Sequence, residues 1–227
     1  MKKENILIVV AHRDDETLGC GGTIAKFAKQ NYNLFAISMT DGVSSRLEFK
    51  KKEIKERYNN SIKASKILNF KWLDDISGKF QDNRMDKASI LEITKLIEKA
   101  KKKIRPTIVI THYPEDLNID HQIVANATMT AFRPKTNEKC RLILSFEVPS
   151  STDYANFKKK TFNPNYFVNI FKFWKQKKRA LKMYKKEILN YPNSRSLKGL
   201  ENLAKYRGNQ VGLKMAESFY ILRSLEK

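Results

Sequence analysis

The chain has 227 residues, enough to bury a hydrophobic core without disulfides or a structural metal. Its 41% hydrophobic and 30% charged residues exclude a disordered chain, a collagen and a coiled coil. Forty-five Lys and Arg against 24 Asp and Glu give a net charge of +21, which either attracts nucleic acid, anionic lipid or a phosphorylated substrate, or reflects only a solvated lysine-rich surface.

The first apolar run covers residues 6–11, which is far shorter than the ~18 residues of a membrane span. It is also shorter than the ~7–15-residue apolar core of a signal peptide, and charged residues follow it at once. Two cysteines, Cys20 and Cys140, cannot make a disulfide framework. We therefore expect a cytoplasmic protein with reduced thiols.

Strand and helix patterns alternate along the first 150 residues. We predict strands at residues 5–11, 33–40, 106–111 and 141–146, and helices at 23–30, 48–68, 85–103 and 119–132. The strands are short, β-branched apolar runs, as expected of strands buried on both faces. This order predicts an α/β fold with a Rossmann-like open, mostly parallel sheet and flanking helices.

Residues 150–227 are predicted to be a basic, mostly helical extension, packed on the same core within a single domain of residues 1–227. Two helical patterns cover residues 171–189 and 196–206, and residues 151–227 hold 18 basic and 5 acidic residues. An aromatic run at residues 166–174 precedes several lysines. This pattern fits aromatics in the core beside solvated lysines, an aromatic wall for stacking sugar rings, or a helix lying on an anionic membrane.

The three histidines all stand at the ends of predicted strands or the starts of helices. His12 follows the first strand, His112 ends the strand at 106–111, and His121 opens the next helix. Ligands of open α/β sheets bind outside the carboxyl ends of the strands. We therefore expect the two polar clusters around these histidines to face one crevice.

Two imidazoles and one carboxylate form a three-ligand zinc site with an open fourth position. Asp14, Asp15 and Glu16 supply more carboxylates than ligation requires, and one of them could move a proton between water and a leaving group. Each residue also has a structural interpretation, since Asp commonly caps helices and a histidine at a strand end is usually a hydrogen-bonded loop residue. The gathering of all three histidines in two acidic clusters favours the metal site.

The glycines at residues 19, 21 and 22 allow two interpretations. A glycine-rich loop after a strand can cradle a phosphate, but the spacing is not Gly-x-Gly-x-x-Gly and the preceding carboxylates would repel a pyrophosphate. Close helix packing beside the site explains these glycines better.

Residues 11–22, Ala-His-Arg-Asp-Asp-Glu-Thr-Leu-Gly-Cys-Gly-Gly, resemble the Ala-His-Pro-Asp-Asp-Glu signature and Gly-x-Gly-Gly of the PIG-L (LmbE-like) zinc N-deacetylases. Residues 112–121 resemble that family's second motif, Asp-x-Asn-x-Asp-His. Weaker similarities continue along the chain, at Thr40-Asp41-Gly42, Arg57, residues 147–152, Arg195-Ser196, Arg207-Gly208 and residues 216–219.

The resemblance implies a hydrolase that removes an acetyl group from an N-acetylated sugar, an N-acetylhexosamine of a glycan, glycolipid or sugar-nucleotide pathway. It implies that His12, Asp15 and His121 bind Zn²⁺, for which another divalent metal could substitute. It also implies that Asp14 is the general base and then the general acid. The candidates to hold the oxyanion are Arg57, Asn118 and His112. Asp120 either orients a neighbouring group or acts as a first-turn acid of its helix.

The sequence departs from the family pattern at two positions. Arg13 replaces the signature proline, where it could pair with Glu16 or reach a substrate phosphate. Asn118 stands where many members have a histidine. The alternative function is a non-catalytic basic module that binds nucleic acid or a phosphorylated sugar. Because no helix-turn-helix, zinc-finger or RNP-like motif is present, we do not expect nucleic acid as the partner.

Overall fold

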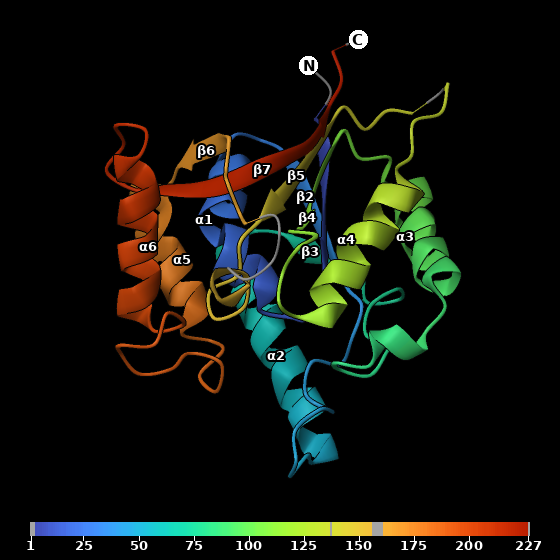
Figure 1. The fold of residues 1–227 in the computed structure, drawn as a ribbon, viewed down its shortest axis with the longest axis horizontal. Helices are drawn as coiled ribbons and strands as arrows, with labels where there is room; N and C mark the ends of the chain where they lie inside the picture. Colours follow the sequence, from blue (N-terminus) through green and yellow to red (C-terminus); the bar gives the residue numbers. More distant parts are fainter. Residues whose placement is uncertain (1–2, 137, 156–160, 227) are drawn as a thin grey trace.

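The computed structural model describes residues 3–136, 138–155 and 161–226. Its centre is a seven-stranded sheet in the order β3-β2-β1-β4-β5-β7-β6, with helices on both faces (Figure 1). Strands β1 to β5 run parallel to one another, whereas β7 is antiparallel to both β5 and β6. The strands are β1 (Asn5–Val10), β2 (Asn33–Ser38), β3 (Lys71–Trp72), β4 (Ile108–His112), β5 (Leu142–Phe146), β6 (Tyr166–Asn169) and β7 (Ala216–Ser224).

The two faces of β1 pack against different helices, because successive side chains of a strand point to opposite faces. Ile6, Ile8 and Val10 join a core with α1, α2, α5 and α6, while Leu7 and Val9 join a core with α3 and α4. The helices are α1 (Asp15–Lys29), α2 (Lys51–Leu68), α3 (Ile90–Ile104), α4 (Ile119–Ala131), α5 (Trp174–Leu181) and α6 (Leu197–Asn209). The predicted Rossmann-like α/β fold is confirmed.

Helix α1 begins at Asp15, earlier than the predicted start at residue 23, and it kinks at Cys20, where φ is −138°. The first turns of α1 were not predicted because three glycines interrupt the helical pattern. A Cβ atom at Gly19 would lie 2.0 Å from Cδ2 of Phe146, and one at Gly22 would lie 2.8 Å from Cβ of Ile170. The glycines therefore let α1 approach its neighbours closely, which confirms the packing interpretation.

We expect Gly19→Ala to destabilise the protein by roughly 1–3 kcal/mol, because the added methyl overlaps the ring of buried Phe146. Gly21→Ala is the matched control in the same helix, since its Cβ would come no closer to another residue than 3.3 Å, to Cγ of Lys177. Urea unfolding of the two variants measures the difference. Equal stability of both would contradict the packing role of Gly19.

Residues 150–227 contain two strands, β6 and β7, that the sequence analysis did not predict. The predicted helix at 171–189 is a 3-10 turn at Phe171–Phe173 followed by the short α5, and the predicted helix at 196–206 is α6. Since β7 pairs with β5, this segment extends the central sheet.

Of the aromatic run beside the lysines, Trp174 lies in the core, and Tyr166 and Phe173 are partly buried against it. Trp174 is buried against α1 and α2, and Lys177 of α5 is buried and forms an ion pair with Glu217, 2.6 Å away. Phe171 is 49% exposed, with Lys214 over its ring. No helix among the described residues is long and apolar enough to cross a bilayer.

The candidate metal centre and its cleft

The three histidines meet at the carboxyl ends of β1 and β4, which are parallel neighbours in the sheet. His12 lies just beyond β1, His112 is the last residue of β4, and His121 is in the first turn of α4. The rings of His112 and His121 stack with their centroids 3.9 Å apart, and the His12 ring lies 5.2 Å from that of His121. The two polar clusters thus face one crevice, as their positions in the sequence indicated.

Three side-chain atoms lie at mutual distances suited to a tetrahedral metal. His12 Nδ1 is 3.2 Å from Asp15 Oδ2 and 3.2 Å from His121 Nε2, and Asp15 Oδ2 is 3.5 Å from His121 Nε2. Zn–N and Zn–O bonds near 2.1 Å at tetrahedral angles place ligand atoms about 3.3 Å apart. His12, Asp15 and His121 therefore fit a zinc ion in both donor type and spacing.

The second nitrogen of each of these histidines faces a carboxylate. His121 Nδ1 lies 3.2 Å from Asp116 Oδ1, while His12 Nε2 lies 2.9 Å from Asp82 Oδ1 and 3.3 Å from Asp120 Oδ2. Carboxylates in this position fix the tautomer and orientation of metal-binding histidines. The nitrogens His12 Nδ1 and His121 Nε2 are thereby left for the metal.

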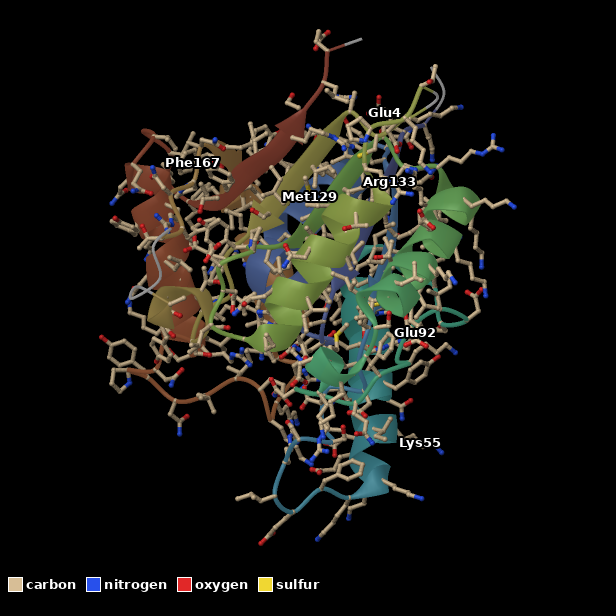
Figure 2. The ribbon with its side chains drawn as sticks, turned by 45° about the vertical axis from the view of Figure 1, so that its right-hand side comes forward. Glu4, Lys55, Glu92, Met129, Arg133 and Phe167 are labelled. Carbon is tan, nitrogen blue, oxygen red and sulfur yellow. The ribbon has the colours of Figure 1, made fainter. Side chains whose placement is uncertain are left out.

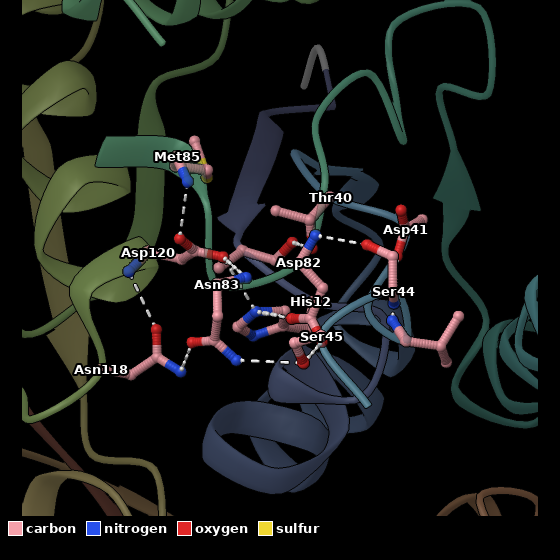
Figure 3. A network of polar contacts seen from close by, with 12 residues as sticks. His12, Thr40, Asp41, Ser44, Ser45, Asp82, Asn83, Met85, Asn118 and Asp120 are labelled. Atoms are coloured by element: carbon pink, nitrogen blue, oxygen red, sulfur yellow. Dashed lines mark hydrogen bonds and ion pairs between the residues drawn. The ribbon is translucent and has the colours of Figure 1, made fainter. Parts of the chain in front are cut away.

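Figure 3 shows how the contacts around His12 hold Asp120 in place. The Asp120 carboxylate accepts hydrogen bonds from the backbone N–H groups of Asn83 (2.7 Å) and Met85 (3.1 Å). His12 Nε2 and carboxylate oxygens of Asp82 and Asp120 form a second group of candidate ligands. Both Asp120 oxygens accept a backbone hydrogen bond, whereas Asp15 accepts only one from the described residues, at Oδ2 from His12 N–H, so we assign the Asp120 group to the support of His12 and not to the metal.

Burial and mutual attraction set the charges of the ligand group. Burial alone would raise the pKa of Asp15, but the facing imidazoles of His121 and His12 hold it well below its usual range. Burial would lower the pKa of His121, but Asp15 and Asp116 raise it to about 9. Without a bound ion, these charges favour the protonated form of His121 below pH about 9.

We expect zinc binding at pH 6 to release at least one proton per ion. The pKa of His121, about 9, lies above this pH, so its imidazole is protonated and must become neutral to bind metal. Its affinity for zinc should therefore rise with pH up to about 9. Calorimetric titrations in two buffers of different ionisation enthalpy measure the released protons. Zinc binding without proton release would contradict this account of the site.

Asp14 lies beside the ligand group but makes none of the ligand contacts. It is 1% exposed, and its Oδ1 accepts a 2.7 Å hydrogen bond from Arg57 Nη2. Its Oδ2 accepts no hydrogen bond from the described residues. Asp14 occupies the N-cap position of α1 without a side-chain cap bond, so the capping interpretation fails. Burial raises its pKa, an effect that the Arg57 charge partly offsets. The side chain is suited to accepting a proton at Oδ2.

Arg57 is buried against Asp14 and an acid from the C-terminal segment. Its Nη1 pairs with Glu187 Oε1 while its Nη2 binds Asp14. Gly42 has a left-handed backbone conformation, with φ of +73°. A Cβ atom at this position would lie 3.2 Å from Arg57 Nε. A glycine is needed there, both for its backbone conformation and for the close approach of Arg57.

Asn118 and Asp120 occupy different places around α4. Asn118 is the N-cap, where its Oδ1 accepts from the backbone N–H groups of Asp120 and His121, and its Nδ2 donates to Asn83 Oδ1. Asp120 faces His12, so the structure favours the orienting role over the capping role. Asn118 remains at the cleft wall with part of its amide committed.

His112 lies behind the ligand group and is completely buried. Its Nε2 accepts a 2.9 Å hydrogen bond from the backbone N–H of Ala11, and burial lowers its pKa to about 4. The neutral ring therefore supports His121 by stacking. It does not line the cleft, which argues against the oxyanion role considered for it.

Arg13 points away from the cleft. Its guanidinium donates to Ser61 Oγ and Asp74 Oδ1 and lies over the Trp72 ring, 4.5 Å from its centroid. It does not pair with Glu16, which instead accepts hydrogen bonds from Thr17 and Tyr184, and it is not among the residues that line the cleft. Arg13, which replaces the signature proline, therefore holds the turn between β1 and α1 against α2 and β3.

Several contributors to the site carried no assigned role in the sequence. Ser151 and Thr152 both donate to Asp116, which in turn faces His121. Their segment was noted only as a weak similarity. Asp82 follows no recognisable motif, and only the folded loop brings it to His12.

The ligand group opens into a polar cleft of about 190 Å³. Its walls carry Arg46, Arg57 and Arg195, together with acidic groups that include Asp14 and Glu187. Arg195 and Glu187 come from the loop between α5 and α6, so the basic C-terminal segment completes the cleft.

Comparison with known proteins gives matches in sequence and in fold. The family described as GlcNAc-PI de-N-acetylase (PIG-L) matches residues 7–132. The uncharacterized deacetylase YaiS of Escherichia coli K12 is 31% identical over 154 residues, which are 66% of this chain and 77% of YaiS. The N,N'-diacetylchitobiose deacetylase of Pyrococcus horikoshii superposes with a TM-score of 0.75 at 19% identity, covering 97% of this chain and 84% of that one.

The same fold also occurs in a protein with a different activity. The 4-carboxy-2-hydroxymuconate hydratase GalB of Pseudomonas putida superposes with a TM-score of 0.76 at 18% identity, covering 99% of each chain. At these identities the structural matches show the fold alone, so the activity has to be argued from the site.

Proposed function

Because the chain belongs to the PIG-L (LmbE-like) deacetylase family, we propose that it is a zinc-dependent hydrolase that removes the acetyl group from an N-acetylated sugar. One observation carries the proposal. A free carboxylate oxygen, Asp14 Oδ2, lies in the cleft beside three donor atoms spaced for a tetrahedral metal. This is the arrangement of a metal-assisted hydrolase.

The chain's own residues would handle the proton. Zinc held by His12, Asp15 and His121 would supply Lewis acidity toward the amide carbonyl and the attacking water. Asp14 Oδ2 takes the proton from that water as its oxygen attacks the carbonyl carbon. Arg57 holds Oδ1, so the carboxylate presents a single oxygen to the reaction. When the C–N bond breaks, Asp14 returns the proton to the departing nitrogen, and acetate and an amine leave.

An N-acetylhexosamine is the substrate class best supported. The matching family is described as GlcNAc-PI de-N-acetylase, and the Pyrococcus horikoshii protein acts on N,N'-diacetylchitobiose. A polar cleft lined by arginines suits a hydroxyl-rich substrate that carries an anionic group. We therefore propose a sugar of a glycan, glycolipid or sugar-nucleotide pathway.

The test is acetate release by the zinc-loaded protein. N-acetylglucosamine, N,N'-diacetylchitobiose and N-acetylglucosamine 1-phosphate serve as substrates, and acetate and free amine are measured together. The proposal expects equal amounts of both products from at least one sugar. A protein that binds zinc but releases no acetate from any of them would contradict it.

A further inference from the structure

The proposed reaction needs a donor for the acyl oxygen, which gains negative charge as water attacks. Most cleft donors are already committed to partners within the protein. Arg57 forms ion pairs with Asp14 and Glu187, and Arg46 forms ion pairs with Glu53 and Glu187. These guanidinium groups are held by carboxylates that neutralise their charge.

Arg195 differs from the other two arginines of the cleft. Its Nε donates to Pro149 O at 3.4 Å, but no described residue accepts a hydrogen bond from its Nη1 or Nη2. Its side chain is only 21% exposed, so its charge is partly shielded from water. Its ion pair with Asp14 Oδ2 is long, at 3.8 Å, so this partly desolvated guanidinium keeps hydrogen-bond donors available to a ligand.

The backbone around Arg195 is held firmly. The backbone N–H of Arg195 donates to Asn193 Oδ1 at 2.8 Å, and the next residue, Ser196, caps α6 by accepting from Gly199 N–H. These contacts present the guanidinium from a fixed loop. A donor that is already held in position costs little reorganisation free energy when the transition state forms.

The guanidinium lies on the reactive side of Asp14. Arg195 Nη1 is 3.8 Å from Asp14 Oδ2, the oxygen that has no hydrogen-bond donor of its own. A water that gives its proton to Oδ2 would lie against this oxygen, with the amide carbon ~3–3.5 Å farther on. The acyl oxygen on that carbon is then within reach of the Arg195 side chain.

We propose that Arg195 is a catalytic residue that donates hydrogen bonds to the acyl oxygen of the substrate as this oxygen becomes an oxyanion. The inference rests on the proposed deacetylase function. The Ser150 hydroxyl is another donor at the cleft wall, but it is neutral, and Arg57 Nε, which has no hydrogen-bond partner among the described residues, belongs to a guanidinium already paired with Asp14 and Glu187. A charged donor is roughly twice as strong as a neutral one.

The test compares Arg195→Met and Arg195→Lys with Ser150→Ala and with Arg133→Met. Arg133 is an exposed arginine just beyond α4, at the opposite end of the molecule from the start of α2 that carries Lys55 (Figure 2). We expect Arg195→Met to lower kcat by about 10²–10³-fold with little change in KM. Arg195→Lys should recover part of the loss, and Arg133→Met should behave as the parent protein.

A second readout does not depend on the sugar. Acetate, the carboxylate product, should bind the zinc-loaded parent protein and bind Arg195→Met roughly 10–100-fold more weakly, as expected for the loss of a charged hydrogen bond. Weakened acetate binding without deacetylation of any sugar by the parent would place the failure in the proposed function and not in the role of Arg195.

Three results would overturn the inference. The first is unchanged acetate binding in Arg195→Met, or a parent protein that does not bind millimolar acetate. The second is a rise in KM alone, confined to sugars that carry a phosphate, which would make Arg195 a binder of that phosphate. The third is that Ser150→Ala, and not Arg195→Met, lowers kcat.

Discussion

Asp14→Asn is expected to lower kcat by about a thousandfold while leaving zinc bound. The amide keeps the shape of the side chain but cannot take a proton, and general acid–base catalysis contributes roughly 10²–10⁴-fold. The ligand atoms belong to His12, Asp15 and His121, so the zinc content should remain at one ion per chain. Acetate release and elemental analysis of the same sample measure the two effects.

Asp75→Asn is the control for this variant. Asp75 is about half exposed and pairs with Lys103 on the surface, where such pairs contribute little. Its activity should equal that of the parent. If Asp14→Asn retained full activity, or lost activity only by losing zinc, Asp14 would not be the base.

Removing a ligand is expected to have the second large effect. Asp15→Ala and His121→Ala each delete one of three donor atoms, so neither variant should retain zinc through gel filtration. Asp15 and His121 attract each other in the buried site, so each variant also removes a buried ion pair. Circular dichroism must therefore show that each variant is folded.

Asp116→Asn gives a graded comparison, because it touches His121 but not the metal position. The loss of such a supporting carboxylate typically costs 10–100-fold in metal affinity. Zinc affinity should therefore fall in the order parent, Asp116→Asn, His121→Ala. Full zinc occupancy in folded His121→Ala would contradict the ligand assignment.

The sequence predicted those strands and helices whose own residues show a clear apolar pattern. The apolar run of β1 and the position of His12 after it were enough to place one edge of the crevice. The start of α1 was missed because glycines disfavour helix in isolation, whereas here Gly19 and Gly22 allow close contact with Phe146 and Ile170. Local propensity does not contain that contact.

Strand β7 was missed for a related reason. It carries the buried polar residues Glu217 and Ser218, which interrupt the alternation that identifies a strand. Glu217 is satisfied by Lys177 and by the backbone N–H groups of Gly22 and Thr23, from segments far away in the sequence. Only the folded chain explains an acid at that position.

Some residues of the candidate site could be identified from the sequence, and others could not. Motif resemblance pointed to the ligands and to Asp14, whose roles stay predictions until metal and activity are measured. Asp82 carried no signal in the sequence, and Arg195 was noted only as a weak similarity without a role, because each reaches the cleft from a separate loop. The cytoplasmic location and the single-domain organisation also remain predictions from the sequence.

The most direct test of the metal centre is a crystal structure of the zinc-loaded protein with anomalous diffraction at the zinc edge. The account predicts one peak about 2.0–2.2 Å from His12 Nδ1, Asp15 Oδ2 and His121 Nε2, with Asp14 Oδ2 unbound beside it. A peak between His12 Nε2, Asp82 and Asp120, or none at either group, would contradict it.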